Sequence, residues 1–197
     1  MNDVLSQRDY VLILDKSGSM GTADCNGKSR WAAAQESTEA LARKCAEFDA
    51  DGLDVYVFAN SFKKYPNTTP DSVSRIFKEN EPMGSTDLYS VLKDALDGYF
   101  VTKAKPVTIL VITDGEPNDK VSVSDLIINT SKRLEKDEEV AISFIQIGKD
   151  VLARDWLKSL DDDLTAKGAK FDIVDTVTFD AMENMTISEV LLNAIND

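Results

Sequence analysis

Short apolar runs alternate with amphipathic segments along this chain. The runs are short and hold few polar residues, which is typical of strands covered on both faces of a sheet. In the segments between them, apolar residues recur at steps of three and four, which predicts helices with one packed face. The expected strands are residues 10–14, 53–58, 62–65, 107–113, 140–147 and 171–174, and the expected helices are residues 31–48, 71–80, 88–99, 122–136, 151–160 and 187–195.

This alternation of strands and helices with short connections predicts an α/β fold. We expect a doubly wound, mostly parallel six-stranded sheet flanked by helices, in the strand order 3-2-1-4-5-6. The third strand, at residues 62–65, is expected at an edge of the sheet and ends before Pro66. No internal repeat or linker divides the sequence, so we expect residues 1–197 to form a single domain.

Oxygen-bearing side chains follow two of the expected strands. Asp15, Ser17 and Ser19 follow the first strand at alternating positions, and Asp114 follows the fourth. Since these two strands flank the point where the strand order reverses, both carboxylates are expected to reach one crevice. Thr86 lies in a loop between them in sequence, at the start of a helix. Hydroxyls and carboxylates without sulfur or imidazole suit a hard divalent cation, with magnesium expected first and manganese or calcium as alternatives.

Each of these elements also has a simpler interpretation when it is taken alone. The residues after the first strand can form a plain turn, as can Asp114 with Gly115, because Ser, Gly and Asp are frequent turn residues. Thr86 can serve as an ordinary helix N-cap. The conjunction of all three segments, each at a strand end or helix start, favours the metal site.

These segments also carry a family resemblance. Asp-Lys-Ser-Gly-Ser at residues 15–19, Gly-Ser-Thr-Asp at residues 84–87 and Thr-Asp-Gly at residues 113–115 resemble the metal-ion-dependent adhesion site of the von Willebrand factor A (VWA) domain family. The resemblance covers essentially the whole chain. The segment Thr-Asp-Gly-Glu-Pro at residues 113–117 is similar to the corresponding segment of intracellular bacterial members of the family, some of them found with tellurite-resistance proteins.

The resemblance implies a bound divalent cation, usually magnesium. Ser17, Ser19 and Thr86 would be direct ligands, while Asp15 and Asp114 would often act through water. The cation would then keep an open position, which an Asp or Glu carboxylate of a partner protein fills. The resemblance therefore implies a protein-interaction module and not an enzyme. It also implies that the C-terminal helix, residues 187–195, is the candidate moving part.

Composition narrows the class of partner. The net charge of −13 argues against a nucleic-acid or anionic-membrane binder, because such a field repels phosphates.

The N-terminal residues show no secretory signal, so the expected location is the cytoplasm. Cys25 and Cys45 are expected to be free thiols, and Trp31 and Trp156 to be packing residues. The absence of histidine removes the commonest general base.

Two enzyme classes compete with this interpretation. Residues 21–29 end in Gly-Lys-Ser before a helix, like the phosphate loop of nucleotide hydrolases, but five residues separate the two glycines where that loop needs four. A metal-assisted hydrolase would need a base, for which the candidates are Asp24, Asp87 and Glu116. The loop of residues 21–30 borders the site. Whether it shields the cation, supplies Asp24 as a ligand or shapes the choice of partner stays open.

Overall fold

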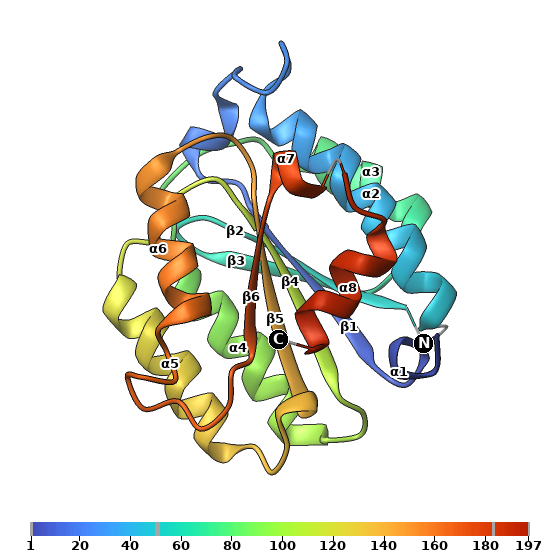
Figure 1. Ribbon diagram of the computed structural model, residues 1–197. Coiled ribbons are helices and arrows are strands. Elements are labelled where there is room, and N and C mark those ends of the chain that lie inside the picture. Colours follow the sequence, from blue (N-terminus) through green and yellow to red (C-terminus); the bar gives the residue numbers. More distant parts are fainter. Residues whose placement is uncertain (1, 50–51, 183, 197) are drawn as a thin grey trace.

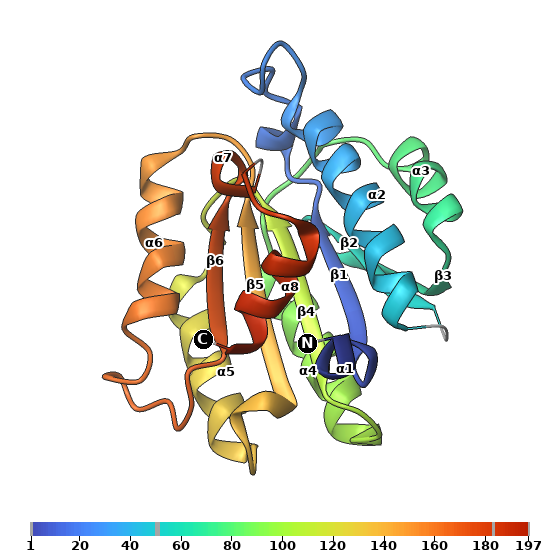
Figure 2. The ribbon, with the colours of Figure 1, turned by 45° about the vertical axis from the view of Figure 1, so that its right-hand side comes forward.

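The computed structural model describes residues 2–49, 52–182 and 184–196. A six-stranded sheet in the order β3-β2-β1-β4-β5-β6 forms its centre, with helices on both faces (Figures 1 and 2). The predicted fold class and strand order are therefore confirmed. The strands are β1 (Asp9–Asp15), β2 (Leu53–Phe58), β3 (Phe62–Thr68), β4 (Val107–Thr113), β5 (Val140–Gln146) and β6 (Val174–Thr178).

Ten helical segments connect or flank these strands in the described part of the chain. They are α1 (Asn2–Ser6), η1 (Gly18–Gly21), α2 (Arg30–Phe48), α3 (Pro70–Glu79), α4 (Leu88–Thr102), α5 (Lys120–Arg133), η2 (Asp137–Glu139), α6 (Val151–Asp162), α7 (Phe179–Met182) and α8 (Ile187–Asn196), where η marks a 3-10 helix. The short helices α1 and α7 have no counterpart among the predicted elements. None of the described helices is long and apolar enough to cross a bilayer.

The strands pair in parallel except for β3, which runs antiparallel along β2 at the edge. β1 lies between β2 and β4, with Asp15 opposite Phe58 and Ile13 opposite Val111. The carboxyl ends of β1 and β4 are therefore neighbours at one edge of the sheet. We call this the carboxyl edge.

The two faces of the sheet bury separate clusters of apolar side chains. Residues of α4, α5 and α6 cover one face, and residues of α1, α2, α3 and α8 cover the other (Figure 2). Every residue of β4 and β5 is buried, which is why these strands are mostly apolar in sequence. Trp31 packs on Phe77 with ring centroids 4.4 Å apart, and Trp156 lies against Phe144, so both tryptophans are packing residues as predicted. Both cysteines are buried and free, also as predicted.

Two strand predictions were wrong. The last strand begins at Val174, where the expected one ends, because Phe171 instead packs against the core while the strand itself carries polar residues at its half-buried positions. β3 continues through Pro66 to Thr68. It is an edge strand, where the missing N–H of proline leaves no ladder bond broken.

The start of α5 also differs from its prediction. The expected helix begins at residue 122, but the N-cap is Asp119, whose carboxylate accepts a hydrogen bond of 2.9 Å from the Ser122 backbone N–H. A carboxylate three residues ahead of a free N–H makes this cap directly. The helix consequently begins before Ser122 and ends at Arg133.

Candidate metal centre

Three loops meet at the carboxyl edge of the sheet. The loop after β1 is tied to the loop before α4, because the Gly18 N–H donates to the Gly84 carbonyl at 3.0 Å. The loop before α4 is tied in turn to the loop after β4, since the Asn118 N–H donates to the Thr86 carbonyl at 2.9 Å and the Thr86 N–H donates to Asn118 Oδ1 at 3.1 Å. Backbone hydrogen bonds thus hold all three predicted segments together.

The middle loop depends on a glycine. Gly84 has φ +84°, and a Cβ at this position would lie 2.3 Å from Asn60 Oδ1. The same Asn60 oxygen accepts a hydrogen bond of 2.6 Å from the Ser85 N–H. Only glycine fits both the backbone conformation and this close approach. The loop that carries Thr86 is therefore fixed from the end of β2.

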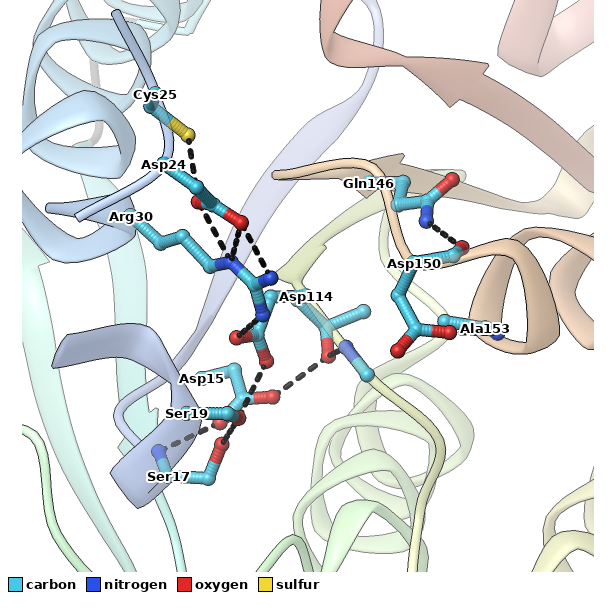
Figure 3. Close-up of polar contacts among 12 residues, drawn as sticks. Asp15, Ser17, Ser19, Asp24, Cys25, Arg30, Asp114, Gln146, Asp150 and Ala153 are labelled. Carbon is cyan, nitrogen blue, oxygen red and sulfur yellow. Dashed lines mark hydrogen bonds and ion pairs between the residues drawn. The ribbon is translucent and has the colours of Figure 1, made fainter. Parts of the chain in front are cut away.

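Four of the five predicted site residues form one hydrogen-bonded group (Figure 3). The Ser17 N–H donates to Asp15 Oδ1 at 2.7 Å, and the Ser17 and Ser19 hydroxyls lie 3.2 Å apart. The Ser19 hydroxyl donates to Asp114 Oδ1 at 2.9 Å. The alternating spacing after β1 thus turns two hydroxyls toward a carboxylate that follows β4.

Thr86, the fifth predicted residue, joins the group through its loop. Its side chain is largely buried, and within the described part of the chain no hydrogen bond reaches its hydroxyl. The alternative that Thr86 caps α4 is wrong. The N-cap is Asp87, which accepts a hydrogen bond of 3.1 Å from the Ser90 N–H. The Thr86 hydroxyl is left available to a ligand.

Both carboxylates of the group are buried: Asp15 is 0% exposed and Asp114 is 1% exposed. Burial raises the pKa of Asp15 to about 6, although hydrogen bonds from Thr113 and Ser17 oppose that shift, and the neighbouring Asp114 adds to it. Two carboxylates withdrawn from water at one place favour a bound cation, because a positive charge offsets their desolvation and mutual repulsion.

Two further residues belong to this group although sequence reasoning did not single them out. The Thr113 hydroxyl donates to Asp15 Oδ2 at 2.6 Å. Arg30, the first residue of α2, places Nη1 2.7 Å from Asp114 Oδ2. On its other side Arg30 binds Asp24, with Nε 3.0 Å from Oδ1 and Nη2 2.6 Å from Oδ2. No periodic pattern in the sequence points to this pair, because Asp24 lies in a polar loop and Arg30 is the residue that ends it.

In the loop of residues 21–30, the residues that resemble a phosphate loop have other partners. Cys25 and Lys28 form a small antiparallel bridge, and Lys28 pairs with Glu36. The Ser29 side chain caps α2 by accepting a hydrogen bond of 3.1 Å from the Ala32 N–H. The lysine and serine of the apparent motif therefore serve the loop and the helix.

A family model for the VWA domain found at the TerF C terminus matches residues 8–195. The chain belongs to this vWA-TerF-like family. VWA domains are typically metal-dependent adhesion or interaction modules, and the predicted membership of the VWA family is confirmed. A search of curated proteins finds no match to this VWA domain.

Solved structures share the fold of this VWA domain at low sequence identity. The manganese-loaded TRAP protein of Plasmodium vivax aligns with a TM-score of 0.65 and 15% identity, over 89% of this chain and 70% of that one. The PilB minor pilin of Streptococcus sanguinis aligns with a TM-score of 0.64 and 16% identity, over 93% of this chain and 60% of that one. A von Willebrand factor type A protein of Catenulispora acidiphila aligns with a TM-score of 0.56 and 18% identity, over 83% of this chain and 42% of that one.

The donor atoms of this VWA domain fit a hard cation. Within residues 2–49, 52–182 and 184–196 there is no cluster of three or more His, Cys, Asp or Glu side chains that could hold a metal. The hydroxyls of Ser19 and Thr113 donate to the two buried carboxylates, Asp114 and Asp15. Oxygen donors of this kind suit magnesium, manganese or calcium and disfavour zinc or copper.

Proposed function

We propose that this VWA domain is a metal-dependent protein-interaction module. Asp15, Ser17, Ser19, Thr86 and Asp114 hold one divalent cation, magnesium first and manganese or calcium as alternatives. A bound cation of this kind acts as a Lewis acid that accepts one more oxygen ligand. An Asp or Glu carboxylate of a partner protein supplies that ligand.

The observation that carries this proposal is the hydrogen-bonded group at the carboxyl edge. It joins residues 95 or more positions apart, since Ser19 donates to Asp114 and Thr113 donates to Asp15. A group of buried oxygens from separate loops has little to contribute to folding, because each buried carboxylate costs free energy unless it is compensated. The manganese-loaded TRAP protein, which shares the fold, supports a divalent cation here.

Binding without catalysis is the second part of the proposal. Each candidate base named from the sequence is already engaged: Asp24 by Arg30, Asp87 by the first turn of α4, and Glu116 by Lys120. The Arg30 hydrogen bonds lower the pKa of Asp24, which makes it a weaker base.

We further propose that the protein works in the cytoplasm and binds neither nucleic acid nor membranes. Two buried free thiols and a net charge of −13 agree with that.

Calorimetric titration with Mg²⁺ and Mn²⁺ tests the cation site. Asp15→Asn and Thr86→Val keep side-chain shape but remove a charge and a hydroxyl, so each should weaken binding by a factor of about ten or more. Asp155→Asn, at an exposed position of α6, is the matched control and should bind as the wild type does. Equal affinity in all four proteins would refute the proposed site.

Capture of a carboxylate needs a separate experiment. Proteins retained by the immobilised domain in Mg²⁺ should be lost in a chelator and should not be retained by Thr86→Val. Replacing acidic residues of a retained protein by their amides should also release it. If the same proteins stayed bound in the chelator, partners would bind at another place on the domain.

A further inference from the structure

Arg30 brings a positive charge into the group that is proposed to hold the cation. Its guanidinium lies 2.7 Å from Asp114 Oδ2, and only 13% of its side chain is exposed. Asp24 contacts the opposite side of the same guanidinium, as Figure 3 shows. The hydrogen bonds that Arg30 donates to Asp24, together with its contact with Asp114, raise the pKa of Arg30 further, so it is charged at any physiological pH.

The stability of α2 does not explain this arginine. Arg30 is the first residue of the helix, and the first turn contains no acidic residue. The positive end of the helix dipole disfavours a cation at this position by about 0.3–1 kcal/mol. The location of Arg30 is thus unfavourable for the helix and is compensated by its two carboxylate partners.

The end of β5 makes room for the guanidinium. Gly148 has φ +81°, and a Cβ at that position would lie 2.7 Å from Arg30 Nε. The Arg30 N–H also donates to the Thr22 carbonyl at 2.9 Å, which fixes the loop at the base of the side chain. Arg30 is therefore positioned by its surroundings and is not a mobile surface residue.

The two oxygens of Asp114 have different partners. Oδ1 accepts from the Ser19 hydroxyl, on the side of the proposed ligands, whereas Oδ2 accepts from Arg30. Arg30 can therefore stay in place while Oδ1 serves a cation. In that arrangement its charge cancels much of the charge of Asp114, and Asp24 in turn offsets Arg30.

We infer that Arg30 is a built-in counter-charge that lowers the affinity of this site for its divalent cation, and that Asp24 limits the effect. The inference rests on the proposed function, because it concerns the cation of the same site. A cation held against fewer net negative charges retains more positive charge for a carboxylate from outside. Weak metal binding in the absence of a partner follows from this charge balance.

Mn²⁺ titration calorimetry of the full chain tests the inference. Arg30→Gln should tighten Mn²⁺ binding about tenfold, the effect expected for removing one charge several ångströms from a divalent ion near a protein surface. Lys28→Gln is the matched control, since it removes the same charge from the same loop at a side chain that is 53% exposed and pairs with Glu36. Its affinity should stay within about twofold of the wild type.

Asp24→Asn separates charge from loop structure. Both Arg30→Gln and Asp24→Asn break the same ion pair, so damage to the loop would change Mn²⁺ affinity in the same direction. The counter-charge role predicts opposite directions: Asp24→Asn weakens binding, and the double variant Asp24→Asn/Arg30→Gln returns toward the wild type. Thermal unfolding of each metal-free variant checks that it is folded.

The outcomes distinguish this inference from the proposed function. Mn²⁺ binding that Asp15→Asn weakens but Arg30→Gln leaves unchanged or weakens would overturn the counter-charge role alone. No Mn²⁺ binding by the wild type or by any variant would overturn both. Binding that becomes measurable only in Arg30→Gln would support both.

Discussion

A buried arginine, Arg8, and a half-buried one, Arg30, lie at opposite ends of the sheet's parallel strands, and their partners differ in kind. Arg8 is 2% exposed and donates to the Thr108 hydroxyl and to the carbonyls of Val107 and Glu138, at 2.6–2.9 Å. Burial lowers its pKa to about 10. Arg30 donates instead to two carboxylates, one of which belongs to the proposed metal centre.

The difference teaches how to separate a structural charge from a functional one. The hydrogen bonds of Arg8 end on neutral backbone and hydroxyl groups, which no ligand replaces, so Arg8 can only stabilise the fold. The contact of Arg30 with Asp114 neutralises a charge that a cation could neutralise as well. The contribution of Arg30 to stability should therefore depend on metal, and that of Arg8 should not.

Arg8→Met should have the largest effect on stability. It leaves three acceptors without their donor, two of them buried, which costs about 3 kcal/mol of unfolding free energy. Urea denaturation with and without Mn²⁺ measures it, and the loss should be the same in both. Arg43→Met, at a side chain that is 70% exposed, is the control and should change stability by less than about 0.5 kcal/mol. If Mn²⁺ restored the stability that Arg8→Met loses, the two arginines would not differ in their dependence on metal.

Arg30→Gln should destabilise the metal-free protein by about 2 kcal/mol, because Asp114 then stays buried without its cationic partner. In the same denaturation experiment, saturating Mn²⁺ should recover most of this loss. The partial exposure of Arg30 makes the effect smaller than that of Arg8. A deficit that persists in Mn²⁺ would mean that Arg30 mainly holds the loop.

Thr113→Val should cost about 1.5 kcal/mol in metal-free protein, since a buried carboxylate oxygen loses a hydrogen bond of 2.6 Å while the side-chain shape is kept. The change should also weaken Mn²⁺ binding, because it raises the pKa of Asp15 further. Thr108→Val offers the comparison at the other end of the parallel strands, where Thr108 accepts from Arg8. That variant should lose stability without any change in Mn²⁺ affinity.

The metal-free protein should become less stable as the pH rises from about 5 to about 7. The folded-state pKa of Asp15 is about 6, above its ordinary value of 3.8, so the folded protein binds more protons than the unfolded one between these values. Stability that is present below pH 3.8 is therefore lost as the pH rises through about 6, by about 1 kcal/mol between pH 5 and 7. Denaturation at both pH values should give a smaller loss for Asp15→Asn. Identical pH dependence in the two proteins would contradict the assignment to Asp15.

The strand order and the loops of the candidate centre could be predicted from sequence, because buried parallel strands leave mostly apolar runs. β6 was misplaced since polar residues such as Asp175 and Thr176 lie along an edge strand, while the more apolar residues before it pack elsewhere. Thr113 could not be recognised as a site residue. Every position of β4 is buried, so no alternation of apolar and polar residues shows toward which face of the sheet a side chain points. Arg30 could not be found either. Its direction depends on how the loop of residues 21–30 turns before α2, which no periodic pattern records.

Anomalous diffraction from crystals grown with Mn²⁺ would test the central claim most directly. The account predicts one manganese peak within coordination distance of the hydroxyls of Ser17, Ser19 and Thr86, with Arg30 still on Asp114 Oδ2. A manganese peak elsewhere, with these three hydroxyls bound only to protein or water, would contradict it.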